Sequence, residues 1–177
     1  MTALRDWTHE TTEIGDHRTL ARTRRATPEE CIELARELDI LTCDSVGVEY
    51  AIKSLGKDRY RFSGTLEAAV SQACVVTLDP VPARISETFS IELGPPETLG
   101  DDAPPAGDRE ILSMPDVEPI EDGRIDVGTM VFGMISAALD PYPRRSDAEF
   151  DWIDPKIKAD PEASNPFAAL AKLKPKP

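Results

Sequence analysis

Residues 59–93 read RYRFSGTLEAAVSQACVVTLDPVPARISETFSIEL, and this stretch decides the fold. Its first part places apolar or small side chains on alternate positions from Tyr60 to Val70, with polar side chains between them. A period of two is typical of a strand with one buried and one solvated face. Two prolines in residues 79–82 lack N–H donors, so we expect the ladder to stop there. Because the alternation then resumes as far as Leu93, the stretch predicts a β-hairpin.

A further strand is expected directly before the hairpin. From Ser45 to Leu55 the side chains again alternate, and Gly56 can adopt the positive φ of a short turn into Arg59. The three strands would form an antiparallel meander whose long middle strand bends near Gly64 or at residues 72–74. The sequence therefore predicts an α+β fold, with a bent or barrel-like sheet built on this meander and packed by two amphipathic helices.

Two segments carry the period of a helix. The first begins at Thr27, which is followed by a proline and, three residues after the cap, by a glutamate that can bond back to the Thr27 N–H. We expect it to end near Asp39. The second is capped by Asp126 and repeats apolar side chains at helical spacing as far as Leu139. Both helices should bury one face against the sheet.

The remaining segments suggest the domain boundaries. Residues 1–26 show no sustained period and predict an extended N-terminal arm that could add an edge strand. Residues 27–145 form the single α+β domain, with a mobile acidic loop rich in proline at 94–119. Residues 146–177 predict an extended C-terminal segment with a short docking helix near 165–173, which is too short to be stable in water on its own.

The formal charge of −13 limits the classes of partner. Between Glu87 and Asp126 we count twelve acidic side chains and two arginines. A polyanion would be repelled by such a protein unless a basic patch is held apart. The charge therefore favours a basic protein as partner.

Direct binding to RNA is the alternative that the sequence leaves open. It would use the basic N-terminal segment together with the lysines between residues 172 and 176. A third class, a small-molecule site in the hollow of the sheet, would need a deep polar pocket that the sequence does not predict. The candidate RNA-binding residues of the N-terminal segment are Arg18, Arg22, Arg24 and Arg25.

No motif in the sequence predicts an active site. His9 and His17 both lie in the irregular N-terminal segment, where we expect no base to be oriented, and no phosphate-binding or dinucleotide-binding loop is present. Cys31, Cys43 and Cys74 form no Cys-x-x-Cys pair, so we expect buried, reduced thiols. We therefore predict no catalytic, cofactor-binding or metal-binding residues, and no enzyme.

The sequence also predicts a cytoplasmic protein without membrane contact. No apolar run approaches the roughly 20 residues needed to span a bilayer, and the first residues lack the basic and apolar regions of a signal peptide.

Three separated segments carry a family resemblance. They are QACVVTLDPV at residues 72–81, GRIDVG at 123–128 running into ALDPYPRR at 138–145, and NPFAALAKLK at 165–174. In this order they resemble the YceD family of large ribosomal RNA subunit accumulation proteins. The resemblance spans residues 27–174, and its last segment is the most specific.

The resemblance implies a role in biogenesis of the large ribosomal subunit and no known reaction. On this basis we expect a factor that supports accumulation of the large ribosomal RNA by binding a basic ribosomal protein or another assembly factor. The expected docking element is the C-terminal segment. Its candidate partner-binding residues are Asn165, Pro166, Phe167, Leu170, Leu173 and Lys174.

Overall fold

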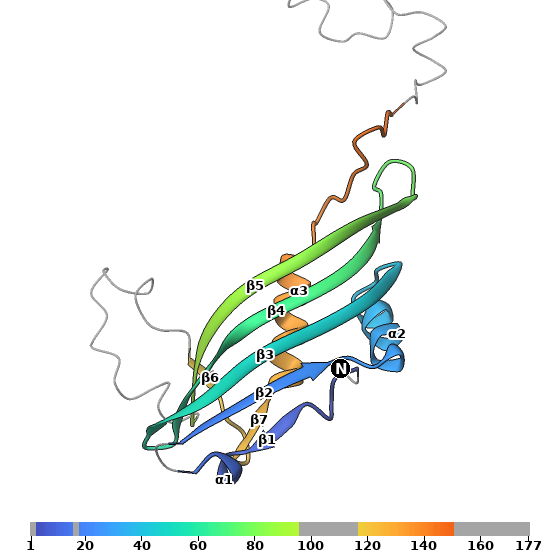
Figure 1. Cartoon of the computed structure of the whole chain (residues 1–177). Helices are drawn as coiled ribbons and strands as arrows, with labels where there is room; N and C mark the ends of the chain where they lie inside the picture. The colour runs from blue at the N-terminus through green and yellow to red at the C-terminus, as the bar shows by residue number, and fades with distance from the viewer. Residues whose placement is uncertain (1–2, 16–17, 96–116, 151–177) are drawn as a thin grey trace, which may run out of the picture. The chain divides into compact units, whose positions relative to one another are not determined.

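The structure is a computed structural model that describes residues 3–15, 18–95 and 117–150 (Figure 1). In chain order the elements are β1 (Thr8–Glu10), α1 (Thr11–Ile14), β2 (Thr19–Arg25), α2 (Pro28–Glu37), β3 (Thr42–Gly56), β4 (Arg59–Ala73), β5 (Pro80–Gly94), β6 (Val117–Pro119), β7 (Arg124–Asp126) and α3 (Val127–Ala138). The chain divides after Arg145 into two units, and only residues 146–150 of the second are described.

The main sheet has five strands in the order β2-β3-β4-β5-β6. Its first four strands pair antiparallel in chain order, and β6 pairs parallel with the end of β5. A separate two-stranded sheet joins β1 to β7. The α+β class and the largely antiparallel sheet are confirmed, although the sheet holds more strands than the sequence predicted. The barrel-like curvature stays a prediction.

The predicted hairpin of β4 and β5 is present, but its ladder does not stop at the prolines. Pairing continues without a register shift from Tyr60 opposite Leu93 to Ala73 opposite Pro80. The prediction that two missing N–H donors would end the ladder is therefore wrong. In an antiparallel pair only every second residue bonds to its neighbour, and Pro80 and Pro82 occupy the positions whose N–H would point away from β4.

The long strands β3 and β4 approach each other closely at Gly64, which pairs with Tyr50. A Cβ atom at Gly64 would lie against the carbonyl oxygen of Glu49 and 2.8 Å from the Cα of Tyr50. Only a residue without a side chain fits this crossing of two backbones.

The two predicted helices form with their predicted caps. In α2 the Thr27 hydroxyl accepts from Glu30 N, and the Glu30 carboxylate accepts from Thr27 N, which completes a capping box. In α3 the Asp126 carboxylate accepts from Thr129 N. α3 lies behind the sheet in Figure 1 and joins the core of sheet side chains. Its buried residues are Val127, Gly128, Val131 and Ile135.

The N-terminal segment differs from the extended arm that we expected for residues 1–26. It contains β1, α1 and β2, and it buries the side chains of Leu4, Trp7 and Ile14 in the core. Gly128 in α3 packs so closely on Leu4 that a Cβ there would clash with the Leu4 backbone. The described part of this segment therefore belongs to the folded domain. The sequence did not predict this, because the apolar side chains that it buries follow no regular period.

Most of the predicted acidic loop and the predicted C-terminal helix lie outside the described residues. Within the part that the structure describes, no helix is long and apolar enough to cross a membrane.

Candidate functional site at the β4–β5 turn

The turn from Cys74 to Asp79 has a fixed backbone. Cys74 N donates to the Asp79 carbonyl over 2.8 Å, and Leu78 N donates to the Cys74 carbonyl over 2.9 Å. Asp79 N donates to Thr77 Oγ1 over 3.3 Å. Leu78 has a φ of +63°, which residues with a side chain seldom adopt. These bonds hold Leu78 in a conformation that leaves 74% of its surface exposed.

The segment from Asp140 to Arg145, which follows α3, is bound at three places to this turn and to the end of β4. The Gln72 amide donates to the Asp140 carbonyl over 2.9 Å and accepts from Asp140 N over 3.3 Å. Val75 N donates to the Pro143 carbonyl over 2.8 Å. Arg145 forms an ion pair of 3.0 Å with Asp79. Two segments more than sixty residues apart in the chain thus form one continuous surface.

The Cys74 thiol lies beneath this junction and has no exposed surface. It accepts hydrogen bonds from the Thr77 side chain, from the backbone N–H of Arg145, and from the backbone N–H groups of Thr77 and Val76. These bonds, with that from the Thr77 side chain the strongest, lower the pKa of the Cys74 thiol to about 6. The Cys74 sulfur therefore lies where N–H groups of the turn and of Arg145 converge.

Three apolar side chains of this junction face solvent. The exposed fractions are 53% for Val75, 74% for Leu78 and 76% for Tyr142. We call these three residues, with the Asp79–Arg145 ion pair, the turn surface. Apolar side chains on a backbone that is already fixed lose little conformational entropy on binding, which suits them to a protein interface.

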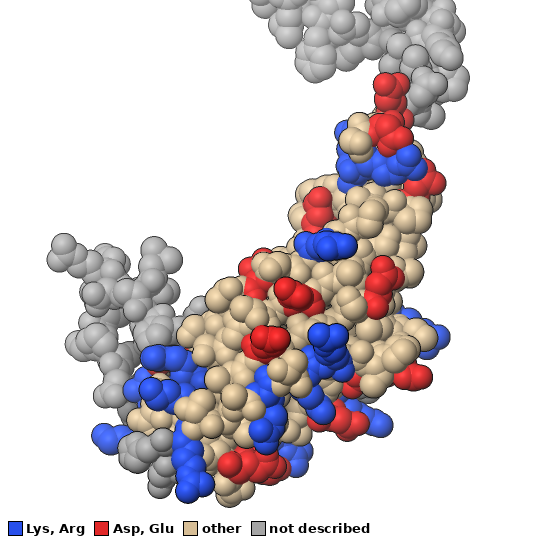
Figure 2. All heavy atoms as spheres, viewed as in Figure 1, with Lys and Arg blue, Asp and Glu red and all other residues tan. Residues whose placement is uncertain are grey.

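The structure places the four candidate RNA-binding arginines along the edge strand β2 and just before it. Arg22 and Arg24 are two residues apart in β2 and so point to the same face of the strand, whereas Arg25 points to the other face. Arg24 donates to the Asp6 carbonyl over 2.9 Å and lies 5.4 Å from the centre of the Trp7 ring, whereas Arg22 donates to the Ala21 carbonyl over 3.0 Å. Arg25 lines a shallow hollow on the sheet that also contains two glutamates. Figure 2 shows basic side chains gathered over the lower part of the sheet with acidic ones among them.

His9 is oriented, contrary to our expectation for the N-terminal segment. Its Nε2 lies 2.7 Å from the hydroxyl of Tyr50, and its Nδ1 lies 3.4 Å from the Glu13 carboxylate. Tyr50 is buried, and burial raises the pKa of its hydroxyl, so the hydroxyl stays protonated at neutral pH. The three side chains join β1 and α1 to β3. Sequence spacing could not reveal this, since His9 and Tyr50 are 41 residues apart.

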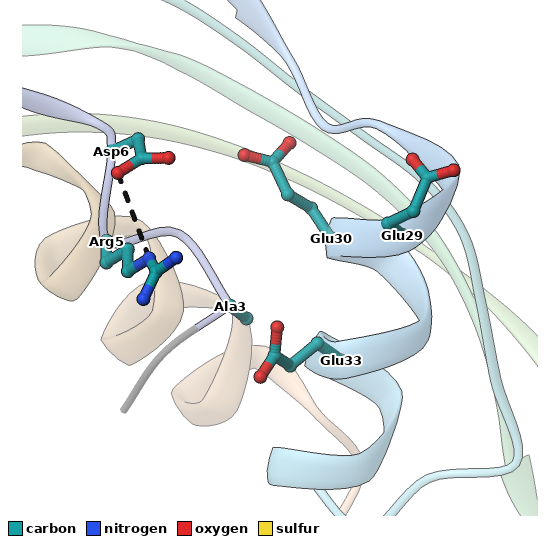
Figure 3. A pocket seen from close by; sticks show the side chains of 6 residues that line it. All are labelled: Ala3, Arg5, Asp6, Glu29, Glu30 and Glu33. Atoms are coloured by element: carbon teal, nitrogen blue, oxygen red, sulfur yellow. Dashed lines mark ion pairs between the residues drawn. The ribbon is translucent and has the colours of Figure 1, made fainter.

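An acidic hollow of about 290 Å³ lies between the N-terminal turn and α2 (Figure 3). Glu30 is held in place there, because its carboxylate accepts from Trp7 Nε1 over 3.0 Å and from Thr27 N over 2.7 Å. The Nε atom of Arg5 lies 3.9 Å from Oδ1 of Asp6. The hollow thus contains four carboxylates and one guanidinium. The residues that line it are Ala3, Arg5, Asp6, Glu29, Glu30 and Glu33.

Within residues 3–15, 18–95 and 117–150, no group of three or more His, Cys, Asp or Glu side chains could hold a metal ion. The candidate docking residues of the C-terminal segment, Asn165 to Lys174, lie outside the described residues. The turn surface is formed by two segments that the sequence singled out only through the family resemblance. The sequence did not predict that these two segments are in contact.

Both segments of the turn surface fall within a family match. The model of the family described as large ribosomal RNA subunit accumulation protein YceD matches residues 62–174. We found no match to the chain among curated proteins or among solved structures. The description of the family refers to the large ribosomal RNA and names no reaction. Because the match covers more than half of the chain and agrees with the resemblance found in the sequence, the chain belongs to the YceD family.

Proposed function

We propose that this chain is a non-enzymatic cytoplasmic factor in biogenesis of the large ribosomal subunit. It supports accumulation of the large ribosomal RNA by binding a basic ribosomal protein or another assembly factor. The family connects the chain to the large ribosomal RNA. Binding to a protein is the mechanism that the surface of the described domain supports best.

The turn surface is the observation that carries this proposal. Leu78 and Tyr142 are each about three-quarters exposed, although both belong to segments fixed by backbone hydrogen bonds. Exposed apolar side chains that gather at a fixed junction mark interaction sites more often than isolated ones do. A partner that covers them would gain hydrophobic energy without having to order the turn first.

The charge favours a basic partner. The chain has a formal charge of −13, and the acidic hollow offers carboxylates from Asp6, Glu29, Glu30 and Glu33 around a space that fits a lysine or arginine side chain. Such complementarity speeds association and weakens as salt screens the charges. We therefore expect the yield of the complex to fall as the salt concentration rises.

Copurification with the tagged chain tests the proposal. Variants with Leu78→Ser and Tyr142→Ser should recover less of the basic ribosomal protein or assembly factor that comes down with the natural chain. Ile32→Ser is the matched control, since Ile32 is an exposed apolar residue of α2, away from the turn surface. The Ile32→Ser variant should recover the partner normally. Equal recovery by all three variants would contradict a role for the turn surface.

The predicted docking role of the C-terminal segment is tested separately. Phe167→Ala should weaken copurification with little effect on the free energy of unfolding, because the docking role assigns Phe167 to the interface with the partner. Unchanged recovery by this variant would rule out the docking role and leave the turn surface as the candidate interface.

Direct RNA binding is the second candidate function. It is favoured by the position of β2 at the sheet edge, because Arg22, Arg24 and Arg25 in this strand and Arg18 just before it are all exposed. Filter binding to large-subunit RNA fragments should then show affinity that falls steeply with salt, and Arg22→Ala with Arg24→Ala should reduce that slope. Failure of the natural chain to bind these fragments at low salt would exclude it.

A further inference from the structure

β6 covers only residues 92–94 of the outer edge of β5, so the rest of this edge presents backbone groups that no described strand pairs with. Cys74 N donates to the Asp79 carbonyl, and the register from there to Leu93 is unbroken. Hydrogen bonds in an antiparallel ladder involve every second residue, so the odd-numbered residues of β5 bond to β4 and the even-numbered ones point away. The Gly94 carbonyl fits this assignment, because it accepts from Ile120 N on the far side of β5.

This edge has a defined length. At one end Pro80 and Pro82 occupy outward-pointing positions and have no N–H, so an added strand cannot pair fully there. At the other end β6 already pairs with residues 92–94. Between these limits the outward N–H and C=O groups belong to four residues. They are Arg84, Ser86, Thr88 and Ser90.

The edge is also regular. The pairing of β5 with β4 contains no register shift, whereas the pairing of β3 with β4 contains two. Of the usual protections of an exposed edge, β5 has prolines at one end and one inward charge, Glu87, but its central part has no bulge and is not short. β6 shows that this side of β5 accepts a strand, since the two pair in parallel over three residues (Figure 1).

The side chains beside the edge indicate what kind of strand would fit. On the core-facing side, Ile85, Phe89 and Ile91 are buried or half-buried, and Glu87 lies among them and is exposed. Cross-strand neighbours interact most strongly as apolar pairs or as opposite charges. An added strand should therefore alternate apolar residues on this side and place a cation opposite Glu87.

We propose that the β5 edge from Ala83 to Ile91 binds an extended, cationic peptide segment of a partner protein as an added strand. RNA has no backbone that could continue the ladder. A second copy of the chain would bring another formal charge of −13 to the same edge, which opposes pairing, whereas a cationic segment is attracted. The proposal concerns any such protein partner and does not depend on the ribosomal function.

A synthetic nine-residue peptide serves as the probe. Its sequence is Val-Thr-Val-Thr-Lys-Thr-Val-Thr-Val, in which lysine replaces the central valine. Titration into the natural chain, followed by amide hydrogen exchange, should slow exchange at Arg84, Ser86, Thr88 and Ser90 by about tenfold or more. The amides of Ile85, Glu87 and Phe89 should change little, because they already bond to β4. Absence of binding at about 1 mM peptide, or protection without this alternation, would overturn the proposal.

Matched variants separate strand addition from other binding. A peptide that is N-methylated at alternate residues cannot pair, and Ser86→Pro removes an outward N–H without removing a bond to β4. Each should weaken binding by about tenfold or more. A peptide with glutamate in place of lysine should also bind more weakly. Equal binding of the N-methylated peptide would exclude a strand, and this control does not require Ser86→Pro to fold.

A second copy of the chain is the competing occupant. If it fills the edge, the same four amides become protected without peptide as the protein concentration rises, and the chain sediments as a dimer. That result would overturn the proposal. We expect a monomer whose four edge amides exchange at the same rate at all concentrations until the peptide is added.

Discussion

Arg145 Nη1 lies 3.0 Å from Asp79 Oδ2, so the segment after α3 is tied to the first residue before β5. The two side chains remain 41% and 51% exposed. An ion pair this exposed contributes at most about 1 kcal/mol to stability. Its main effect is therefore to join the segment that carries Tyr142 to the residue that follows Leu78.

Removing this ion pair should separate binding from stability. Arg145→Ala and Asp79→Ala should each lower the free energy of unfolding by no more than about 1 kcal/mol, measured by urea denaturation. The same variants should reduce copurification of the protein partner. The double variant Asp79→Arg with Arg145→Asp should recover part of the lost copurification. A large loss of stability with normal copurification would contradict this account of the pair.

Two glycines provide a matched test of how closely β3 and β4 approach. Gly64→Ala places a Cβ against the backbone of Glu49 and Tyr50 and should destabilise the fold by about 1–3 kcal/mol. Gly133→Ala in α3 meets nothing within 4 Å and should stabilise the fold by about 0.5–1 kcal/mol, because alanine favours a helix. Thermal or urea unfolding measures both. If the two substitutions change the free energy of unfolding similarly, β3 and β4 can move apart to admit a Cβ atom.

Pro82 should be replaceable without loss of the ladder. Its position opposite Ser71 directs the missing N–H away from β4, so Pro82→Ala breaks no hydrogen bond. We expect the free energy of unfolding to change by less than about 1 kcal/mol, mainly through the entropy of the unfolded chain. The variant also lengthens the accessible edge and should bind the probe peptide at least as well. A loss above about 2 kcal/mol would mean that the proline ring itself packs in the fold.

The Cys74 thiol should make stability depend on pH. Its pKa is lowered from an ordinary value of 9.0 to about 6 in the folded chain. Between these two values the unfolded chain binds more protons, so stability rises with pH from about 6 to 9. The contribution is fully present above pH 9 and is lost as the pH falls through 6.

Thr77→Val tests the cause of that shift, since the Thr77 side chain supplies the strongest bond to the thiolate. The variant should raise the pKa of Cys74 and flatten the rise of stability with pH. Ultraviolet absorbance of the thiolate follows the titration directly, and Cys74→Ser provides the baseline. If the absorbance still titrates near pH 6 in the Thr77→Val variant, the Thr77 hydroxyl does not lower the pKa.

The three long strands and the helices α2 and α3 could be predicted because each has a local cause, whereas the short elements β1, α1, β6 and β7 could not. The capping box at Thr27 and the cap at Asp126 are read from neighbouring residues, and the strands follow from alternation over many positions. The course of the ladder through Pro80 could not be predicted. It depends on which side of β5 each N–H faces, and that is set by the register with β4.

The candidate site could be predicted only in part. Its two segments were both visible in the family resemblance, but the bonds that join them connect side chains and backbone more than sixty residues apart, such as Gln72 to Asp140. No period or spacing carries that information. The same holds for Leu4 and Trp7, whose burial depends on α2 and α3 being in place.

The level of large ribosomal RNA in cells tests the central claim most directly. The natural gene would be replaced by one that encodes Leu78→Ser with Tyr142→Ser, and in a second strain by one that encodes Ile32→Ser. We expect the large ribosomal RNA to fall in the first strain and to stay normal in the second, with both proteins folded and present at equal amounts. Normal large ribosomal RNA in the first strain would contradict the claim that the turn surface binds the partner through which this chain acts.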